Sequence, residues 1–222
     1  MQHFYQNIQG WFSFPGLYKA VINRFPDGSH FVEIGTWKGT SAAFMAVELI
    51  NQNKNIKFDC VDTWEGSEEH RRKYGKWIVF NQQLAGLYEH FLKNIEPVNH
   101  IINPIRKASL DAVHLYEDNS LDFIFIDASH DYENVLKDIT AWYPKIKHKT
   151  GIISGHDIGF PSVRRAVEEF FNAKNLIIQE SEDCWIVGDE RVGLKSPPRS
   201  SAAPRRQLPL VNWSADGIDL TP

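Results

Sequence analysis

A chain of 222 residues with 42% hydrophobic and 23% charged residues has the composition of one soluble globular domain with a sizeable core. Its formal net charge is −4, so the chain lacks the excess of basic residues that is typical of nucleic-acid-binding proteins. This argues against nucleic acid as the main partner. No stretch approaches the roughly 20 apolar residues of a membrane span, and the first residues lack the basic and apolar regions of a signal peptide.

Residues 1–30 are rich in aromatic side chains and precede the first predicted strand. Apolar spacing over 17–25 predicts a helix, and Pro26-Asp27-Gly28-Ser29 predicts the turn that ends it. The aromatic residues allow two interpretations. They form either a cap over an active site or a segment that simply docks on the core.

Residues 31–41, with the sequence Phe-Val-Glu-Ile-Gly-Thr-Trp-Lys-Gly-Thr-Ser, predict a strand over 31–35, a glycine loop and a helix over 40–51. Glycines permit a tight turn and a close approach to a ligand, and a helix N-terminus binds anionic groups. Glu33 at the strand's end can receive a cationic group, so the loop offers places for both ends of an amino acid. The loop lacks the third glycine of the NAD fingerprint.

The predicted strand 57–62 ends in Asp62, where an acid can accept hydrogen bonds from ribose hydroxyls; a plain turn aspartate is the alternative. Residues 63–86 are longer than a simple crossover needs. They predict either a mobile lid that binds the acceptor or a solvated charged helix.

The rest of the chain alternates predicted strands and helices up to residue 187, which predicts a doubly wound, mostly parallel α/β sheet in a single domain over 31–190. The composition of 191–222 is rich in Pro, Ser and Arg and predicts a disordered tail, either a partner motif or an unnatural extension. The predicted strands are 101–105, 121–127, 151–157, 176–179 and 184–187, and the helices are 87–94, 110–117, 132–143 and 161–171.

Four acids follow or end predicted parallel strands and should therefore gather at one edge of the sheet. They are Glu33, Asp62, Asp127 and Asp157. Asp127 and Asp157 offer the oxygen ligands that Mg²⁺ prefers. His156, beside Asp157, favours a softer ion such as Mn²⁺ or Zn²⁺, or is a structural histidine without a metal.

Three motifs together resemble class I S-adenosylmethionine-dependent methyltransferases, most closely the catechol O-methyltransferase-like and macrolide-sugar O-methyltransferase-like branches. They are the loop 33–41, Asp127-x-x-His130 and Gly155-His156-Asp157. The resemblance covers 31–187 and implies a Rossmann-like fold with an antiparallel last strand. It also implies S-adenosylmethionine as cofactor, bound by Glu33, Gly35, Thr36, Gly39, Thr40, Ser41, Asp62, Ala108, Ser109 and Asp127.

Within this set the resemblance gives each group a role. Glu33 would hold the methionine amine, Ser41 and the loop amides its carboxylate, Asp62 the ribose, and Ala108-Ser109 the adenine. Lys107 stands where the branch has a glycine, and Ser109 could equally be the N-cap of the helix 110–117.

The resemblance also implies the chemistry. His130 is the expected general base and Asp127 a catalytic metal ligand, with Mg²⁺ or Mn²⁺ held by Asp127, His156 and Asp157. The branches carry two acids where this chain has His156 and Asp157, which is a departure from their pattern. The alternative for His130 is a helix-capping or surface residue, and Asp131 is expected only to open the helix after it.

The expected partner is a small hydroxylated acceptor, a sugar among the candidates, and a homo-oligomer is allowed but not required. Cys60 and Cys184 lie in apolar runs without metal-ligand spacing, which favours buried, reduced thiols and a cytoplasmic location. Two other functions stay open at this point: a non-catalytic S-adenosylmethionine-binding module and an NAD-dependent oxidoreductase.

Overall fold

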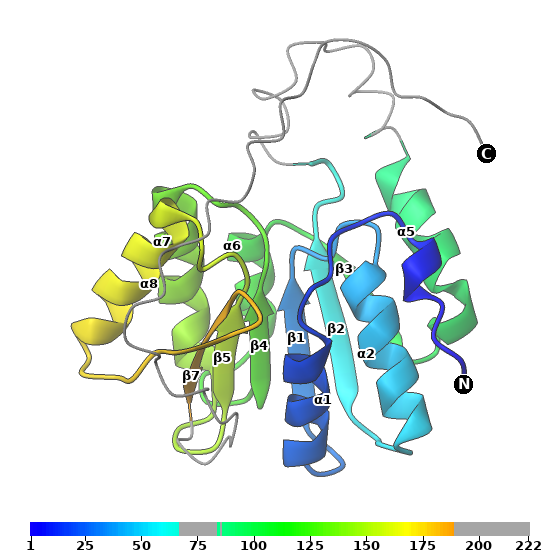
Figure 1. Cartoon of the computed structure of the whole chain (residues 1–222), viewed down its shortest axis with the longest axis horizontal. Coiled ribbons are helices and arrows are strands. Elements are labelled where there is room, and N and C mark those ends of the chain that lie inside the picture. The colour runs from blue at the N-terminus through cyan, green and yellow to red at the C-terminus, as the bar shows by residue number, and fades with distance from the viewer. Residues whose placement is uncertain (67–83, 85, 189–222) are drawn as a thin grey trace, which may run out of the picture.

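A central sheet organises the computed structural model, which describes residues 1–66, 84 and 86–188 (Figure 1). In that part of the chain seven strands lie in the order β3-β2-β1-β4-β5-β7-β6. Neighbours among β1 to β5 pair in parallel, whereas β7 is antiparallel to both β5 and β6. The strands are β1 (His30–Ile34), β2 (Lys57–Asp62), β3 (Ile102–Arg106), β4 (Phe123–Ile126), β5 (Ile152–Gly155), β6 (Gln179–Ser181) and β7 (Cys184–Gly188).

Helices cover both faces of the sheet (Figure 1). One face carries α1 (Pro15–Arg24), α2 (Thr40–Asn51) and α5 (Leu87–Ile95), and the other carries α6 (Ser109–Ala112), α7 (Tyr132–Trp142) and α8 (Pro161–Asn172). Short 3-10 turns are η1 (Tyr5–Asn7), η2 (Glu96–Val98), η3 (Val113–Leu115) and η4 (Tyr143–Lys145). None of the described helices is both long enough and apolar enough to pass through a bilayer.

The side chains of each central strand alternate between two hydrophobic clusters. In β1, Phe31 packs in the cluster under α1, α2 and α5, while Val32 and Ile34 pack in the cluster under α6, α7 and α8. All four residues of β4 are buried, as expected for a strand covered on both faces. Glu33 shares the side of the strand that faces α1 and α2, which determines its environment.

The predicted architecture is confirmed, and most element bounds differ only slightly. Helix α2 and strand β2 occupy exactly the predicted ranges 40–51 and 57–62. The strand predicted over 176–179 is present but shifted, because the backbone N–H of Leu176 bonds to the carbonyl of Phe171 at the end of α8 and β6 starts only at Gln179. The predicted helix over 110–117 is instead the short α6 followed by η3. The proposed lid, apart from 63–66, 84 and 86, and the tail lie outside the described residues.

The N-terminal segment packs on the core and also passes the carboxyl ends of the strands (Figure 1). Ile8 and Phe14 are buried. The carbonyl of Ile8 lies 3.5 Å from Thr40 Oγ1 at the start of α2, and Ser13 Oγ lies 2.9 Å from His156 Nε2 after β5. The segment therefore runs beside the sheet edge at which the predicted site residues lie.

Candidate active site

The glycine loop after β1 is shaped by contact with the end of β4. Gly35 has φ +88°, and a Cβ added there would lie 2.1 Å from the carbonyl oxygen of Asp127. No side chain fits at that separation, so glycine is required for the packing of the two loops as well as for the turn. Gly39, with φ +90°, directly precedes α2 as its N-cap residue.

Glu33 lies beneath the helices with both carboxylate oxygens hydrogen-bonded. Tyr18 Oη of α1 donates to Oε2 at 2.8 Å and Ser41 Oγ of α2 donates to Oε1 at 2.5 Å. Burial, with smaller contributions from the charges of Asp127 and Asp62, raises the pKa of Glu33 to about 7. Glu33 and Ser41 thus contact each other in the structure, and their contact with a cofactor stays a prediction. The sequence pattern did not single out Tyr18.

The Asp62 carboxylate holds the glycine loop by accepting hydrogen bonds from backbone N–H groups. Its Oδ2 accepts the N–H of Trp37 at 2.8 Å, and its Oδ1 accepts the N–H of Trp64 at 2.7 Å. Burial raises the pKa of Asp62, although these backbone hydrogen bonds work in the opposite direction. Asp62 therefore has a structural role at the site, alongside which ribose binding stays a prediction.

Ser109 points into the contact between α6 and α7. Its Oγ donates to Asp138 Oδ1 at 2.6 Å and accepts the indole N–H of Trp142 at 2.8 Å. The alternative of Ser109 as an N-cap is wrong, because Ala108 occupies the N-cap position and Ser109 is the first helical residue. Ala108 is exposed after β3.

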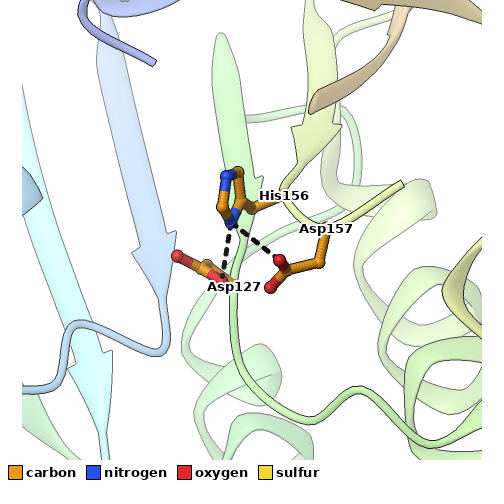
Figure 2. Close-up of side chains that lie close together, drawn as sticks. All are labelled: Asp127, His156 and Asp157. Carbon is orange, nitrogen blue, oxygen red and sulfur yellow. Dashed lines mark ion pairs between the residues drawn. The ribbon is translucent and has the colours of Figure 1, made fainter. Parts of the chain in front are cut away.

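Three predicted metal ligands converge after β4 and β5 (Figure 2). Asp127, His156 and Asp157 each offer one ligand atom, and these atoms lie within 4.8 Å of one another. His156 Nδ1 lies 3.3 Å from Asp157 Oδ1 and 3.8 Å from Asp127 Oδ1. The predicted gathering of strand-end side chains at one edge is therefore confirmed for this cluster.

The cluster has unusual electrostatics because it is largely buried. Burial raises the pKa of Asp127 to about 6, the negative charge of Asp157 adds to the rise, and both nearby histidines oppose it. Burial also disfavours ionised Asp157, but hydrogen bonds from His130 and His156 outweigh it and hold the pKa of that carboxyl well below its usual range. For His156, burial lowers the pKa but the two carboxylates reverse the effect and raise it overall.

His130 lies on the other side of Asp157. Its Nε2 is 2.7 Å from Asp157 Oδ2. Its ring stacks on the half-exposed Phe160, with centroids 5.2 Å apart and an interplanar angle of 16°. Asp131 caps α7 by accepting the N–H of Asn134 at 3.0 Å, which confirms its expected role. Asp157 thus contacts both histidines of the site, one through each carboxylate oxygen.

Residues 32–158 match a protein family described as a methyltransferase domain. The chain belongs to this methyltransferase family. A relative in Sinorhizobium fredii, the uncharacterized protein y4gI, is 27% identical over 126 residues, which cover 57% of this chain but only 13% of that protein. The family supports a methyltransferase over the NAD-dependent oxidoreductase alternative and implies S-adenosylmethionine as methyl donor.

Solved methyltransferases share the fold. The O-methyltransferase NovP has a TM-score of 0.59 at 16% identity, covering 80% of this chain and 79% of its own. The calicheamicin methyltransferase CalS11 has a TM-score of 0.51 at 13% identity over 78% and 76% of the two chains. A putative caffeoyl-CoA O-methyltransferase from Staphylococcus aureus has a TM-score of 0.50 at 17% identity over 82% and 85%.

The glycine loop of the methyltransferase fits the amino-acid end of the cofactor. Helix α2 starts at Thr40, and its N-cap residue Gly39 has no side chain to cap it, which leaves the first-turn N–H groups for an anionic group. Thr36 Oγ1 is buried and has no hydrogen-bond partner among the described residues. Unsatisfied donors at this position suit a carboxylate.

The donor set of the three-residue cluster fits a divalent cation. Two carboxylates and one imidazole nitrogen are ligand types that Mn²⁺ and Zn²⁺ accept, whereas Mg²⁺ prefers oxygen alone. In the structure the imidazole Nδ1 already faces both acids (Figure 2). A cation placed among the three groups would offset the cost of burying two carboxylates next to each other.

Proposed function

We propose that this methyltransferase acts on the hydroxyl group of a small acceptor, with His130 as general base. The observation that carries the proposal is the 2.7 Å contact between His130 Nε2 and Oδ2 of Asp157, which is itself one of the three cluster residues. The base, the candidate cation site and the glycine loop therefore lie at one edge of the sheet. The fold shared with O-methyltransferases supports oxygen as the accepting atom.

The cofactor would lie along the strand ends, between the glycine loop and the loops after β2 and β3. The hydroxyl of Thr36 and the first-turn amide of Thr40 would hold its carboxylate, because the amides of Gly35 and Gly39 already donate to the carbonyls of Val61 and Thr36 and shape the loop instead. Asp62 would hold the ribose, and exposed Ala108 would border the adenine. S-adenosylmethionine supplies a sulfonium methyl group, which an oxygen nucleophile takes by in-line displacement. The residues named here bind and orient it for that displacement.

Asp127, His156 and Asp157 would hold the divalent cation, Mn²⁺ in preference to Mg²⁺ because of the nitrogen donor. A bound cation lowers the pKa of a coordinated acceptor hydroxyl and fixes its direction. These three side chains keep some solvent exposure, through which an acceptor would reach the cation.

His130 would take the acceptor's proton. If His130 Nε2 donates its N–H to Asp157 Oδ2, which lies 2.7 Å away, a neutral His130 would carry its lone pair on Nδ1. Nδ1 of His130 would receive the acceptor's proton as the hydroxyl oxygen becomes the nucleophile, and S-adenosylhomocysteine would be the leaving group. Positioned general bases contribute about 10²- to 10⁴-fold to such reactions.

The test compares His130→Ala with His114→Ala, a change at an exposed histidine of η3. Release of S-adenosylhomocysteine is measured with a panel of phenols and sugars, and cofactor affinity is measured by calorimetry. We expect His130→Ala to slow methyl transfer by about 10²-fold or more without changing cofactor affinity. His114→Ala should match the wild type in both rate and cofactor affinity. Equal losses of rate and affinity in His130→Ala would show that His130 is structural.

A further inference from the structure

A serine from the N-terminal segment contacts the histidine of the cation cluster from the side opposite the acids. Ser13 Oγ lies 2.9 Å from His156 Nε2, whereas His156 Nδ1 faces Asp157 Oδ1 at 3.3 Å and Asp127 Oδ1 at 3.8 Å. Figure 2 shows one ring nitrogen of His156 directed at the two carboxylates and the other directed away from them. Each nitrogen of the ring therefore has a different partner.

We propose that Ser13 is a positioning residue that orients the His156 imidazole for cation binding through Nδ1. An imidazole that binds a cation through Nδ1 carries its proton on Nε2, and that N–H needs an acceptor. Ser13 Oγ is the acceptor that the structure provides. A half-turn of the ring would place carbon atoms against the acids and break the contact with Ser13, so the serine selects one ring orientation.

The backbone around Ser13 is held firmly enough for this role. Phe14, next in the chain, is fully buried, with its ring centroid 4.6 Å from that of Phe125 and 4.9 Å from that of His156. Just beyond, Glu182 caps the start of α1 by accepting the N–H groups of Gly16 at 3.2 Å and Leu17 at 2.9 Å.

The part of the segment that precedes Ser13 contacts the glycine loop and the start of α2. Lys38 Nζ donates to Gln9 Oε1 at 2.5 Å, and Thr40 Oγ1 lies 3.5 Å from the carbonyl oxygen of Ile8. An added Cβ on Gly10 would lie only 2.4 Å from Thr40 Oγ1, which shows how closely the segment approaches α2. Ser13 thus lies on a segment fixed at both ends, unlike the frayed N-terminus of most domains.

The inference rests on the proposed cation site, so its experiment separates the two. Mn²⁺ binding to the whole chain is measured by electron paramagnetic resonance for wild type, Ser13→Ala, Ser13→Thr, Trp11→Ala and His156→Ala. Trp11→Ala is the matched control, because it changes an exposed side chain of the same segment without removing the hydroxyl. Thermal melting of each variant in EDTA shows whether the fold is retained.

We expect Ser13→Ala to weaken Mn²⁺ binding by about 10-fold or more, the usual effect of losing a partner of a metal-bound histidine. Ser13→Thr, which keeps a hydroxyl, should restore most of the affinity, and Trp11→Ala should bind as wild type does. Equal affinity of wild type and Ser13→Ala, with binding lost in His156→Ala, would overturn the role of Ser13 and leave the cation site standing. No Mn²⁺ binding to wild type would overturn both.

Discussion

Glu33→Gln should change how the stability of the protein depends on pH. Burial raises the pKa of Glu33 from 4.5 to about 7, so the folded state holds the proton more tightly than the unfolded state. This contribution to stability is complete below pH 4.5 and is lost as pH rises to about 7. At about 1.4 kcal/mol per pKa unit, the loss is on the order of 3 kcal/mol in total, and most of it falls between pH 5 and pH 8.

Glutamine has nearly the same shape, can hydrogen-bond to Tyr18 and Ser41, and does not titrate. The stability of Glu33→Gln relative to wild type should therefore rise by about 2 to 3 kcal/mol from pH 5 to pH 8. Urea unfolding followed by tryptophan fluorescence at several pH values measures this difference.

Glu117→Gln is the control, because it neutralises an exposed glutamate just after η3. Its stability difference from wild type should stay constant between pH 5 and pH 8. A difference for Glu33→Gln that is equally constant would refute the environment described for Glu33.

Two further substitutions test the packing of the site. Gly35→Ala should lower the free energy of unfolding by about 3 kcal/mol or more, from left-handed strain plus the clash with the Asp127 carbonyl. Gly28→Ala, also at positive φ but with open space around it, should cost about 1 kcal/mol, and equal urea midpoints for the two variants would contradict the close approach. Ser109→Ala leaves a buried carboxylate and an indole N–H without their shared partner, so it should cost about 1–3 kcal/mol. Weaker cofactor binding at unchanged stability would instead place Ser109 at the adenine.

The apolar spacing of the sequence predicted those helices and strands whose bounds depend mainly on which of their own residues are buried. The apolar spacing of 40–51 and the strand that ends in Asp62 gave correct bounds, since one face or both faces of these elements are buried. The alternation of strands and helices placed the loops after β4 and β5 side by side, and Asp127 and Asp157 meet there.

Long-range contacts account for what the sequence could not show. The apolar run Leu176–Gln179 indicates burial, but whether it pairs as a strand depends on how α8 ends. Ser13 and His156 are far apart in the sequence, and no spacing rule joins them. For Glu33, the pattern gave its place near a strand end, but its burial depends on two helices that meet above that strand.

Calorimetric titration with S-adenosylhomocysteine, first in EDTA and then with Mn²⁺ or Mg²⁺, tests the cofactor assignment most directly. We expect a single site that binds S-adenosylhomocysteine, with the cation cluster filled by Mn²⁺ in preference to Mg²⁺. Failure to bind S-adenosylhomocysteine in every buffer would contradict a methyltransferase that uses S-adenosylmethionine.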